Sequence, residues 1–321
     1  MLWCQEHDVD PCAPSSIKLS EYLCFLFRVK KLSPSSVKGH KAAISTTIRQ
    51  MGGPSFSEDP LLRDVIKGMS AESTRFPRRF PSWDLYPVLS SLRLPPYEPL
   101  ESCPLDLLSE KTAFLVSLAS ARRCSEVHAF SFRSLAREPG GAISLRFCSG
   151  FVAKNQKDGT VVPPVIIKSL ENILCEDDED RTLCPVRALK IYKRRTTHLR
   201  SPNKLRLFVS VREDITRDIS VATISRWLRN VIRRAFVASG SSPNPLDCRA
   251  HEIRAWASSM AWAHNVSLSN IMDAAYWHSR ATFIQFYLRE VSRLNQDGSR
   301  DISSVIVAQQ AISTPSTAKR R

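Results

Sequence analysis

The sequence contains no apolar run long enough to cross a membrane, although 43% of its 321 residues are hydrophobic. A membrane-spanning helix needs about 20 consecutive apolar residues. The opening stretch, MLWCQEHDVDPCAPSS, also lacks the basic segment followed by an apolar run that marks a secretory signal. We therefore expect no membrane partner, and the apolar residues are numerous enough to form a sizeable core.

Paired cysteine motifs are missing as well. The nine cysteines are odd in number and irregularly spaced, and no CxxC occurs, which predicts free thiols in a reducing, intracellular compartment. Cys248, His251, His264 and His278 include no second close ligand pair, so zinc is not expected. The five consecutive acidic residues 176–180 cannot converge on one ion and predict a solvated loop. We therefore expect no metal and no cofactor.

Acidic residues are in the minority. The chain has 46 Lys and Arg against 31 Asp and Glu, a net charge of +15 and a pI of about 9.7. Excess positive charge of this size attracts polyanions, of which nucleic acid is the commonest. Many basic proteins do not bind nucleic acid, so composition favours a nucleic acid as a partner without identifying it.

Helical periodicity and helix-breaking residues divide the chain. Residues 15–75 predict a small helical domain with short breaks. Residues 76–105 predict a linker followed by a short helix, because the stretch is rich in Pro, Ser and Arg. Residues 106–312 predict a second domain. We expect residues 1–14 to be left over from a longer protein and residues 313–321 to form a disordered basic tail.

The second domain is predicted to be mainly helical with a small antiparallel β-sheet. Residues 143–168 switch to β-branched residues with a period of two. The sequence KNQKDGT inside this region predicts a hairpin, with Asp158-Gly159 as its turn. Lys154 falls just before that turn. The sheet is therefore expected to carry this lysine.

Basic residues in the first domain and the linker are candidates for contacts with DNA. The predicted helix at 33–52 has a basic face, which solvation explains as well as phosphate binding does. A linker is a natural place for a chain to cross a DNA backbone. The DNA-binding candidates are Lys38, Lys41, Arg49, Arg75, Arg78 and Arg79.

The stretch YWHSRATFIQFYLRE, residues 276–290, contains a tyrosine that has two interpretations. Phe283, Phe286 and Tyr287 recur at helical spacing, which favours a core role for Tyr287. His278 lies nine positions earlier, and nine steps of about 100° place the two on opposite sides of one helix. They can share a site only if His278 lies in a turn and the helix begins after it.

Other residues have the chemistry of a metal-free phosphoryl-transfer site. His251 and Arg254 are three positions apart on a predicted helix and share a face. Arginine forks bind the nonbridging oxygens of a phosphate in the transition state. A phenol such as that of Tyr287 needs a base or a positive field to attack, and a lysine such as Lys154 can protonate the leaving oxygen.

In chain order, these segments resemble the tyrosine recombinase (phage integrase) family. ARRCSEV is similar to the motif of the first arginine and places it at Arg123. The hairpin-lysine segment of the family resembles FVAKNQKDGTVVPP, and its His-x-x-Arg box resembles HEIR. A third family box, in which Tyr follows His by nine positions, resembles WHSRATFIQFY. The resemblance covers roughly 106–290. Each box is weak alone, but their order makes the resemblance specific.

The resemblance implies a fold and a reaction. Residues 15–75 would be a helical, SAM-like core-binding domain that precedes the catalytic domain. Tyr287 would attack a DNA phosphodiester, form a 3′-phosphotyrosyl link and release a 5′-hydroxyl, without metal or ATP. Arg123 and Arg254 would hold the phosphate oxygens. The family also implies a homo-oligomer on DNA, from dimer to tetramer, with a C-terminal helix at 305–312 docked on a neighbouring protomer.

The remaining roles also follow from the resemblance. His251 would accept the tyrosine proton or orient the phosphate, Lys154 would protonate the leaving oxygen, and His278 would donate to a nonbridging oxygen. Lys157 is the alternative to Lys154. Taken singly, each of these residues is as well explained as a helix cap, a turn residue or an ion-pair partner.

A narrower resemblance is to the recombinases of DIRS-type retrotransposons. It is carried by the segments LCPVRALKIYKRRT, ISRWLRNVIRRAF and HEIRAWASSMAW. This predicts a nuclear protein of a transposable element. AAYW before His278 departs from the bacterial pattern, which usually has Leu-Gly there. A type IB topoisomerase-like enzyme and a domesticated, non-catalytic DNA-binding protein remain as alternatives. A metal-dependent nuclease is disfavoured, because no carboxylate cluster has suitable spacing.

Overall fold

The structure is a computed structural model that describes residues 2–73, 83–154, 156, 160–171, 174, 179–200, 205–211, 218–238, 248–277 and 279–288. The chain divides into two compact units, Met1–Phe76 and Pro77–Arg321. No helix in the described ranges has both the length and the apolar character needed to cross a membrane.

Unit 1 consists of four helices: α1 (Leu2–Glu6), α2 (Ser16–Arg28), α3 (Pro34–Gln50) and α4 (Pro60–Glu72). The side chains of Ser15, Ser33 and Asp59 accept backbone N–H groups and cap α2, α3 and α4. Proline occupies the first position of α3 and of α4, where its missing N–H costs nothing. Local sequence therefore sets the start of each of these three helices.

The core of unit 1 forms where α2 packs against α3 and α4, around the fully buried Leu23, Val37 and Leu62. α1 adds to it, because the ring of Trp3 is buried with its centre 5.1 Å from that of Tyr22. Part of the segment before residue 15 therefore belongs to the packed core of unit 1.

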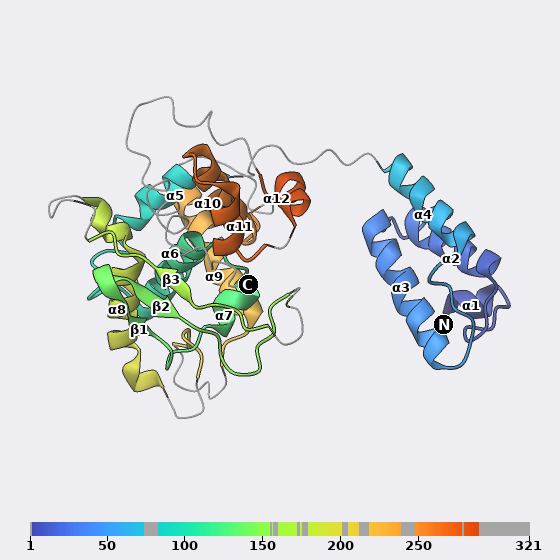
Figure 1. The fold of residues 1–321 in the computed structure, drawn as a ribbon, viewed down its shortest axis with the longest axis horizontal. Coiled ribbons are helices and arrows are strands. Elements are labelled where there is room, and N and C mark those ends of the chain that lie inside the picture. The colour runs from blue at the N-terminus through green and yellow to red at the C-terminus, as the bar shows by residue number, and fades with distance from the viewer. Residues whose placement is uncertain are drawn as a thin grey trace, which may run out of the picture. The chain divides into compact units, whose positions relative to one another are not determined.

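Unit 2 contains eight α-helices within the described ranges: α5 (Leu85–Leu92), α6 (Leu105–Ser120), α7 (Cys124–Ala129), α8 (Pro185–Arg195), α9 (Val221–Ala238), α10 (Glu252–Ala263), α11 (Leu268–Ala274) and α12 (Arg280–Phe286). Three short 3₁₀ turns accompany them: η1 (Pro139–Gly141), η2 (Glu179–Leu183) and η3 (Thr197–Leu199). Every residue of α6 from Leu107 to Ser120 is buried. This helix lies at the centre of unit 2 and packs against α8, α9 and α10 (Figure 1).

A small antiparallel sheet of three strands packs on α6 through β3. Its strands are β1 (Ala136–Arg137), β2 (Ile143–Leu145) and β3 (Val165–Ile167), in that order, with Ile143 opposite Ile167. Gly140 and Gly141 adopt positive φ in the connection between β1 and β2. The predicted fold class, mainly helical with a small antiparallel sheet, is confirmed.

The predicted hairpin has shorter strands and a longer connection between them than its sequence indicates. The paired strands cover only 143–145 and 165–167, and Lys154 lies in the segment that connects them rather than in a strand. Asp158-Gly159 lies outside the described residues. The sheet therefore ends well before the lysine, because no described residue between Phe151 and Pro164 pairs with a strand.

A buried charge cluster ties α6 to α8. The ammonium of Lys111, on the fully buried face of α6, donates to Leu92 O and to the carboxylate of Glu98. Arg187 of α8 donates to both oxygens of Glu98, at 2.8 and 3.0 Å. Burial lowers the pKa of Lys111 to about 8. Burial would raise the pKa of Glu98, but the Arg187 hydrogen bonds and the Lys111 charge hold it below its usual value.

Candidate active site

The first arginine of the site lies at the junction between α6 and α7. Ala121 ends α6 in the left-handed conformation, with φ 50° and ψ 27°. Arg123 is the N-cap of α7, and its Nη1 lies 2.7 Å from Oε1 of Glu126 one turn later. The Glu126 side chain is fully buried, whereas that of Arg123 is one-fifth exposed. Arg123 is thus held by a buried carboxylate and still reaches solvent.

Arg254 approaches the same carboxylate from α10. Its Nη1 lies 3.8 Å from Oε2 of Glu126, and its Nη2 donates to Ala275 O at 2.7 Å. Only 2% of the residue is exposed, yet Nε and Nη1 have no hydrogen-bond partner within the described ranges. Burial and the neighbouring Arg123 charge lower the pKa of the Arg254 guanidinium, which Glu126 opposes. The two arginines predicted from sequence therefore meet at Glu126.

Tyr287 lies beside Arg254 at the end of α12. Its N–H donates to Phe283 O at 2.9 Å, so it belongs to the last turn of the helix. Phe283 is buried in the core, but Tyr287 is half-buried at its edge. The guanidinium carbon of Arg254 lies 5.6 Å from the centre of the Tyr287 ring. The tyrosine is therefore both packed and adjacent to a buried cation.

Aromatic rings fill the space around these residues. The ring of Trp277 lies 4.8 Å from that of Tyr287, and the Arg254 guanidinium carbon lies 4.4 Å from the centre of the Trp277 ring. Ser259 of α10 donates to Tyr287 O at 3.1 Å, which ties the end of α12 to α10. Packing against Trp277 and this hydrogen bond position Tyr287 relative to Arg254.

The other predicted site residues are not gathered in this way. His251 is exposed at the N-cap of α10, one turn before Arg254. Lys154 is exposed between β2 and β3, and within the described part of the chain it makes no hydrogen bond to Arg123, Arg254 or Tyr287. His278 and Lys157 lie outside the described residues. α12 begins at Arg280, which meets the condition that the helix starts after His278.

Two residues of the cluster have no role in the sequence prediction. Glu126 is the common partner of the arginines, and Arg122 is a third guanidinium, with Nη1 3.7 Å from Oε2 of Glu126. Arg122 is 4% exposed and lies near the rings of Phe147 and Tyr276. The only sequence signal for this arrangement is the tandem arginine of ARRCSEV, followed by a Glu.

The cluster has the electrostatics of an anion site. The ion pairs among the described residues bring the guanidinium groups of Arg122, Arg123 and Arg254 to the carboxylate of Glu126, so these four side chains together carry an excess of two positive charges. Buried guanidinium nitrogens without partners are costly in a folded protein, and an oxyanion is their natural ligand. Among the described residues, no group of three or more His, Cys, Asp or Glu side chains is placed to hold a metal ion.

The DNA-binding candidates of unit 1 differ in their surroundings. Lys38 and Arg49 are exposed on α3. Lys41 is half-buried and donates to Ser57 O at 3.0 Å, so its ammonium ties α3 to the loop before α4. Arg75, Arg78 and Arg79 lie outside the described residues. Lys38 is therefore a better candidate than Lys41 for a contact with a phosphate.

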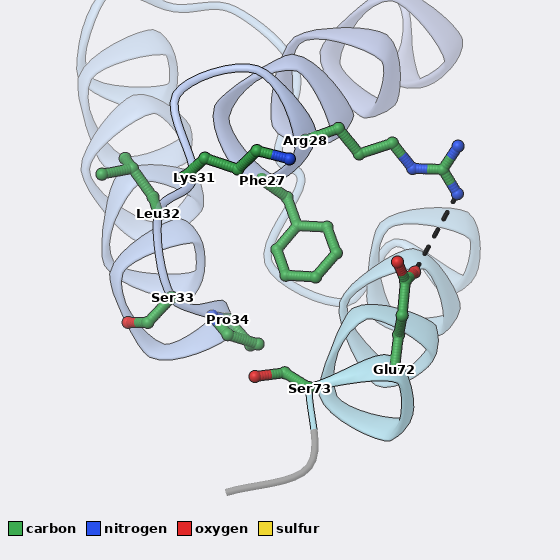
Figure 2. A pocket seen from close by; sticks show the side chains of 8 residues that line it. All are labelled: Phe27, Arg28, Lys31, Leu32, Ser33, Pro34, Glu72 and Ser73. Carbon is green, nitrogen blue, oxygen red and sulfur yellow. Dashed lines mark ion pairs between the residues drawn. The ribbon is translucent and has the colours of Figure 1, made fainter.

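Two pockets border the start of α3. Lys38 lines one of about 320 Å³, together with residues of α4. The other, of about 240 Å³, lies between the ends of α2 and α4, and Figure 2 shows the Phe27 ring pointing into it. Arg28 and Lys31 stand at its rim, but Glu72 lies 4.0 Å from Arg28. The rim of this second pocket is therefore only partly positive.

Comparison with known proteins places this fold. No protein family model and no curated protein sequence matches the chain. Among solved structures, XerH site-specific recombinase bound to palindromic difH substrate is similar, with a TM-score of 0.55 and 14% identity over 87% of this chain and 70% of that one. XerA recombinase has a TM-score of 0.43, with 15% identity over 91% and 85% of the two chains. A lambda integrase dimer on a COC' core site has a TM-score of 0.45, with 13% identity over 86% and 83%.

The likeness to XerH shows that the chain has the fold of the tyrosine recombinases. Fold likeness at this identity does not by itself carry activity or substrate.

Proposed function

We propose that the protein is a DNA breaking and rejoining enzyme, a site-specific recombinase or integrase that acts through a 3′-phosphotyrosyl intermediate. One observation carries the proposal. Arg123 and Arg254 meet at the buried Glu126, and the Tyr287 ring lies beside Arg254, in a chain with the tyrosine recombinase fold. A nucleophile and two phosphate-binding forks are then contributed by three separate elements.

In each step of the proposed reaction, one bond to phosphorus forms as another breaks. The Tyr287 oxygen attacks the scissile phosphorus, the bond to the 5′-oxygen breaks, and a 5′-hydroxyl leaves as it takes a proton. Arg123 and Arg254 neutralise the charge that develops on the nonbridging oxygens. Attack by a 5′-hydroxyl from another strand reverses the steps and releases Tyr287. No net energy source is needed, because one phosphodiester replaces another.

The remaining sequence candidates complete the proposed chemistry. We assign Lys154 to protonation of the leaving oxygen, His251 to acceptance of the tyrosine proton and His278 to a nonbridging oxygen. The segment between β2 and β3 leaves Lys154 exposed, so in this proposal the lysine meets the scissile phosphate when DNA is bound. These three roles depend on the motifs of the sequence and are part of the proposal.

The proposed partner is double-stranded DNA, bound by a homo-oligomer of two to four protomers. The net charge of +15 supports a polyanionic partner, and the similar XerH structure is a complex with a palindromic DNA substrate after cleavage. From the sequence motifs we further propose a recombinase of a DIRS-type retrotransposon that acts in the nucleus.

The proposal is tested by trapping the covalent intermediate. The wild-type protein and Tyr287→Phe are incubated with nicked duplexes from a random-sequence pool, and protein–DNA adducts are resolved under denaturing conditions. Wild type is expected to form an adduct that Tyr287→Phe cannot form. Tyr86→Phe is the matched control, because it removes an exposed phenol of α5 and should leave the adduct unchanged. An adduct that persists in Tyr287→Phe would exclude Tyr287 as the nucleophile.

The same preparations separate recombination from topoisomerase chemistry. A type IB topoisomerase-like enzyme relaxes supercoiled plasmid without exchanging strands between duplexes. Plasmid relaxation alone would favour that alternative, whereas joining of two labelled duplexes supports the recombinase. DNA binding without any adduct in the wild type would instead indicate a non-catalytic DNA-binding protein.

A further inference from the structure

Arg122 is a buried cation that the proposed chemistry does not use. It precedes Arg123 at the junction between α6 and α7, and its side chain is 3% exposed. Among the residues that the structure describes, its Nε and Nη1 have no hydrogen-bond partner. The rings of Phe147 and Tyr276 lie 5.9 and 5.4 Å from its guanidinium carbon, near the limit at which a ring stabilises a cation. These contacts offset only part of the cost of burying the charge.

A purely structural role does not account for a charged side chain in this place. An apolar side chain of similar volume would fill the same space beside the two rings without a desolvation cost. Burial indeed lowers the pKa of Arg122, with the Glu126 charge acting against the shift. The packing at this position therefore does not itself require a positive charge.

The geometry around Glu126 supplies a reason for the charge. Nη1 of Arg123 donates to Oε1 of the carboxylate at 2.7 Å. Arg122 and Arg254 face the other oxygen, Oε2, with their Nη1 atoms at 3.7 and 3.8 Å. Neither reaches the roughly 2.7–2.9 Å of a charge-assisted hydrogen bond. The two guanidiniums share one oxygen, and neither is locked onto it.

We propose that Arg122 is a positioning residue that keeps Arg254 available for phosphate by sharing Oε2 of Glu126 with it. Without the charge of Arg122, Arg254 closes onto Oε2 and forms an ordinary buried ion pair. Its Nη1 is then occupied by Glu126 and no longer open to phosphate. Phosphate binding weakens although neither Arg123 nor Arg254 is altered. The inference rests on the proposed function for the identity of the anion as a DNA phosphate.

The test is a double-mutant cycle between Arg122→Met and Glu126→Gln, with two readouts. Inorganic phosphate is titrated against each protein at constant ionic strength, and its protection against thermal unfolding gives an affinity. The rate of adduct formation on nicked DNA is measured in parallel. Arg122→Met is expected to lower both by about tenfold or more, with a melting temperature equal to or above that of wild type.

The Glu126→Gln protein shows whether the effect of Arg122→Met depends on the carboxylate charge of Glu126. Without the carboxylate charge, Arg254 has no anion to close onto, so Arg122→Met should cost less than about threefold there. Arg122→Lys restores the charge without the planar fork and should recover part of both readouts. Equal losses in the two backgrounds, or a parallel fall in melting temperature and affinity, would overturn the inference, as would an Arg122→Lys protein as weak as Arg122→Met.

The two readouts distinguish this inference from the proposed function. In one outcome, the wild-type protein forms the adduct while Arg122→Met leaves the protection by phosphate unchanged. That result would refute the inference and leave the proposed function standing. Phosphate protection that depends on Arg122, in a protein that never forms an adduct, would support the anion site and refute the recombinase. A wild-type protein that phosphate does not protect would refute the inference.

Discussion

The guanidinium carbon of Arg254 lies 5.6 Å from the centre of the Tyr287 ring, and the Trp277 ring packs against both side chains. Guanidinium groups bind phosphate oxygens through paired hydrogen bonds, so Arg254 is placed to hold a phosphate next to the proposed nucleophile. The relationship therefore joins the proposed nucleophile to the binding group proposed for its target.

Arg254 is expected to be essential for cleavage. Arg254→Lys keeps a charge but loses the fork, so adduct formation should fall by about a hundredfold or more. Single-turnover adduct formation at saturating DNA measures the loss. DNA binding should change much less, since most affinity comes from other phosphate contacts. A lysine variant with the wild-type rate would show that the fork at Arg254 does not bind the reacting phosphate.

Trp277 is expected to be important for stability as well as geometry. It is 7% exposed and packs against Phe283, Tyr287 and Arg254. Trp277→Ala should destabilise unit 2 by about 3–5 kcal/mol, because it leaves a cavity and an uncovered cation. Denaturant unfolding followed by circular dichroism measures the change. Trp277→Phe fills most of the space and should lose much less, so equal losses in both variants would contradict the packing argument.

Lys111 should make the free energy of unfolding depend on pH in the alkaline range. Its pKa is about 8 in the folded protein but about 10.4 when unfolded. Between these values the unfolded chain binds more protons, so this group makes stability rise with pH from 8 to 10.4, by at most about 3 kcal/mol. Unfolding free energies at a series of pH values in this window measure the slope.

Lys111→Met is the variant that isolates this effect. It should remove the part of the slope that Lys111 causes, and Arg187 still pairs with Glu98 in it. Lys190→Met is the control, because it removes an exposed lysine of α8 that pairs with Glu171. The prediction fails if Lys111→Met and wild type show the same dependence on pH.

Lys38 and Lys41 should behave differently despite their proximity on α3. Lys38→Met removes an exposed charge, so DNA affinity should fall and the salt dependence of binding should lose about one unit of slope. Lys41→Met removes the hydrogen bond to Ser57 O and should destabilise unit 1 by about 1 kcal/mol. Binding titrations over a range of salt concentrations, with melting curves, separate the two. A reversed pattern would assign the phosphate contact to Lys41.

Much of the fold is readable from sequence because its signals are local. Ser33-Pro34 and Asp59-Pro60 mark helix starts through capping and a fixed φ, whatever the tertiary contacts. The strands are harder to read, since apolar alternation continues beyond the residues that find a partner. Pairing depends on which segment lies alongside, so within the described part of 143–168 only 143–145 and 165–167 form strands of the sheet.

By itself, the sequence determined the helical fold class, the positive charge and the candidate chemistry of Arg123, Arg254 and Tyr287, because periodicity, composition and residue type are local properties. Only the tertiary structure decided that these three converge, and that Glu126 and Arg122 join them. Convergence depends on how α7, α10 and α12 pack around one core, and spacing along a helix says nothing about distances between helices. Arg122 and Arg123 lie within about one helical turn of Glu126 along the chain, but Arg254 reaches the same carboxylate from another helix, and that contact is a long-range property of the folded chain.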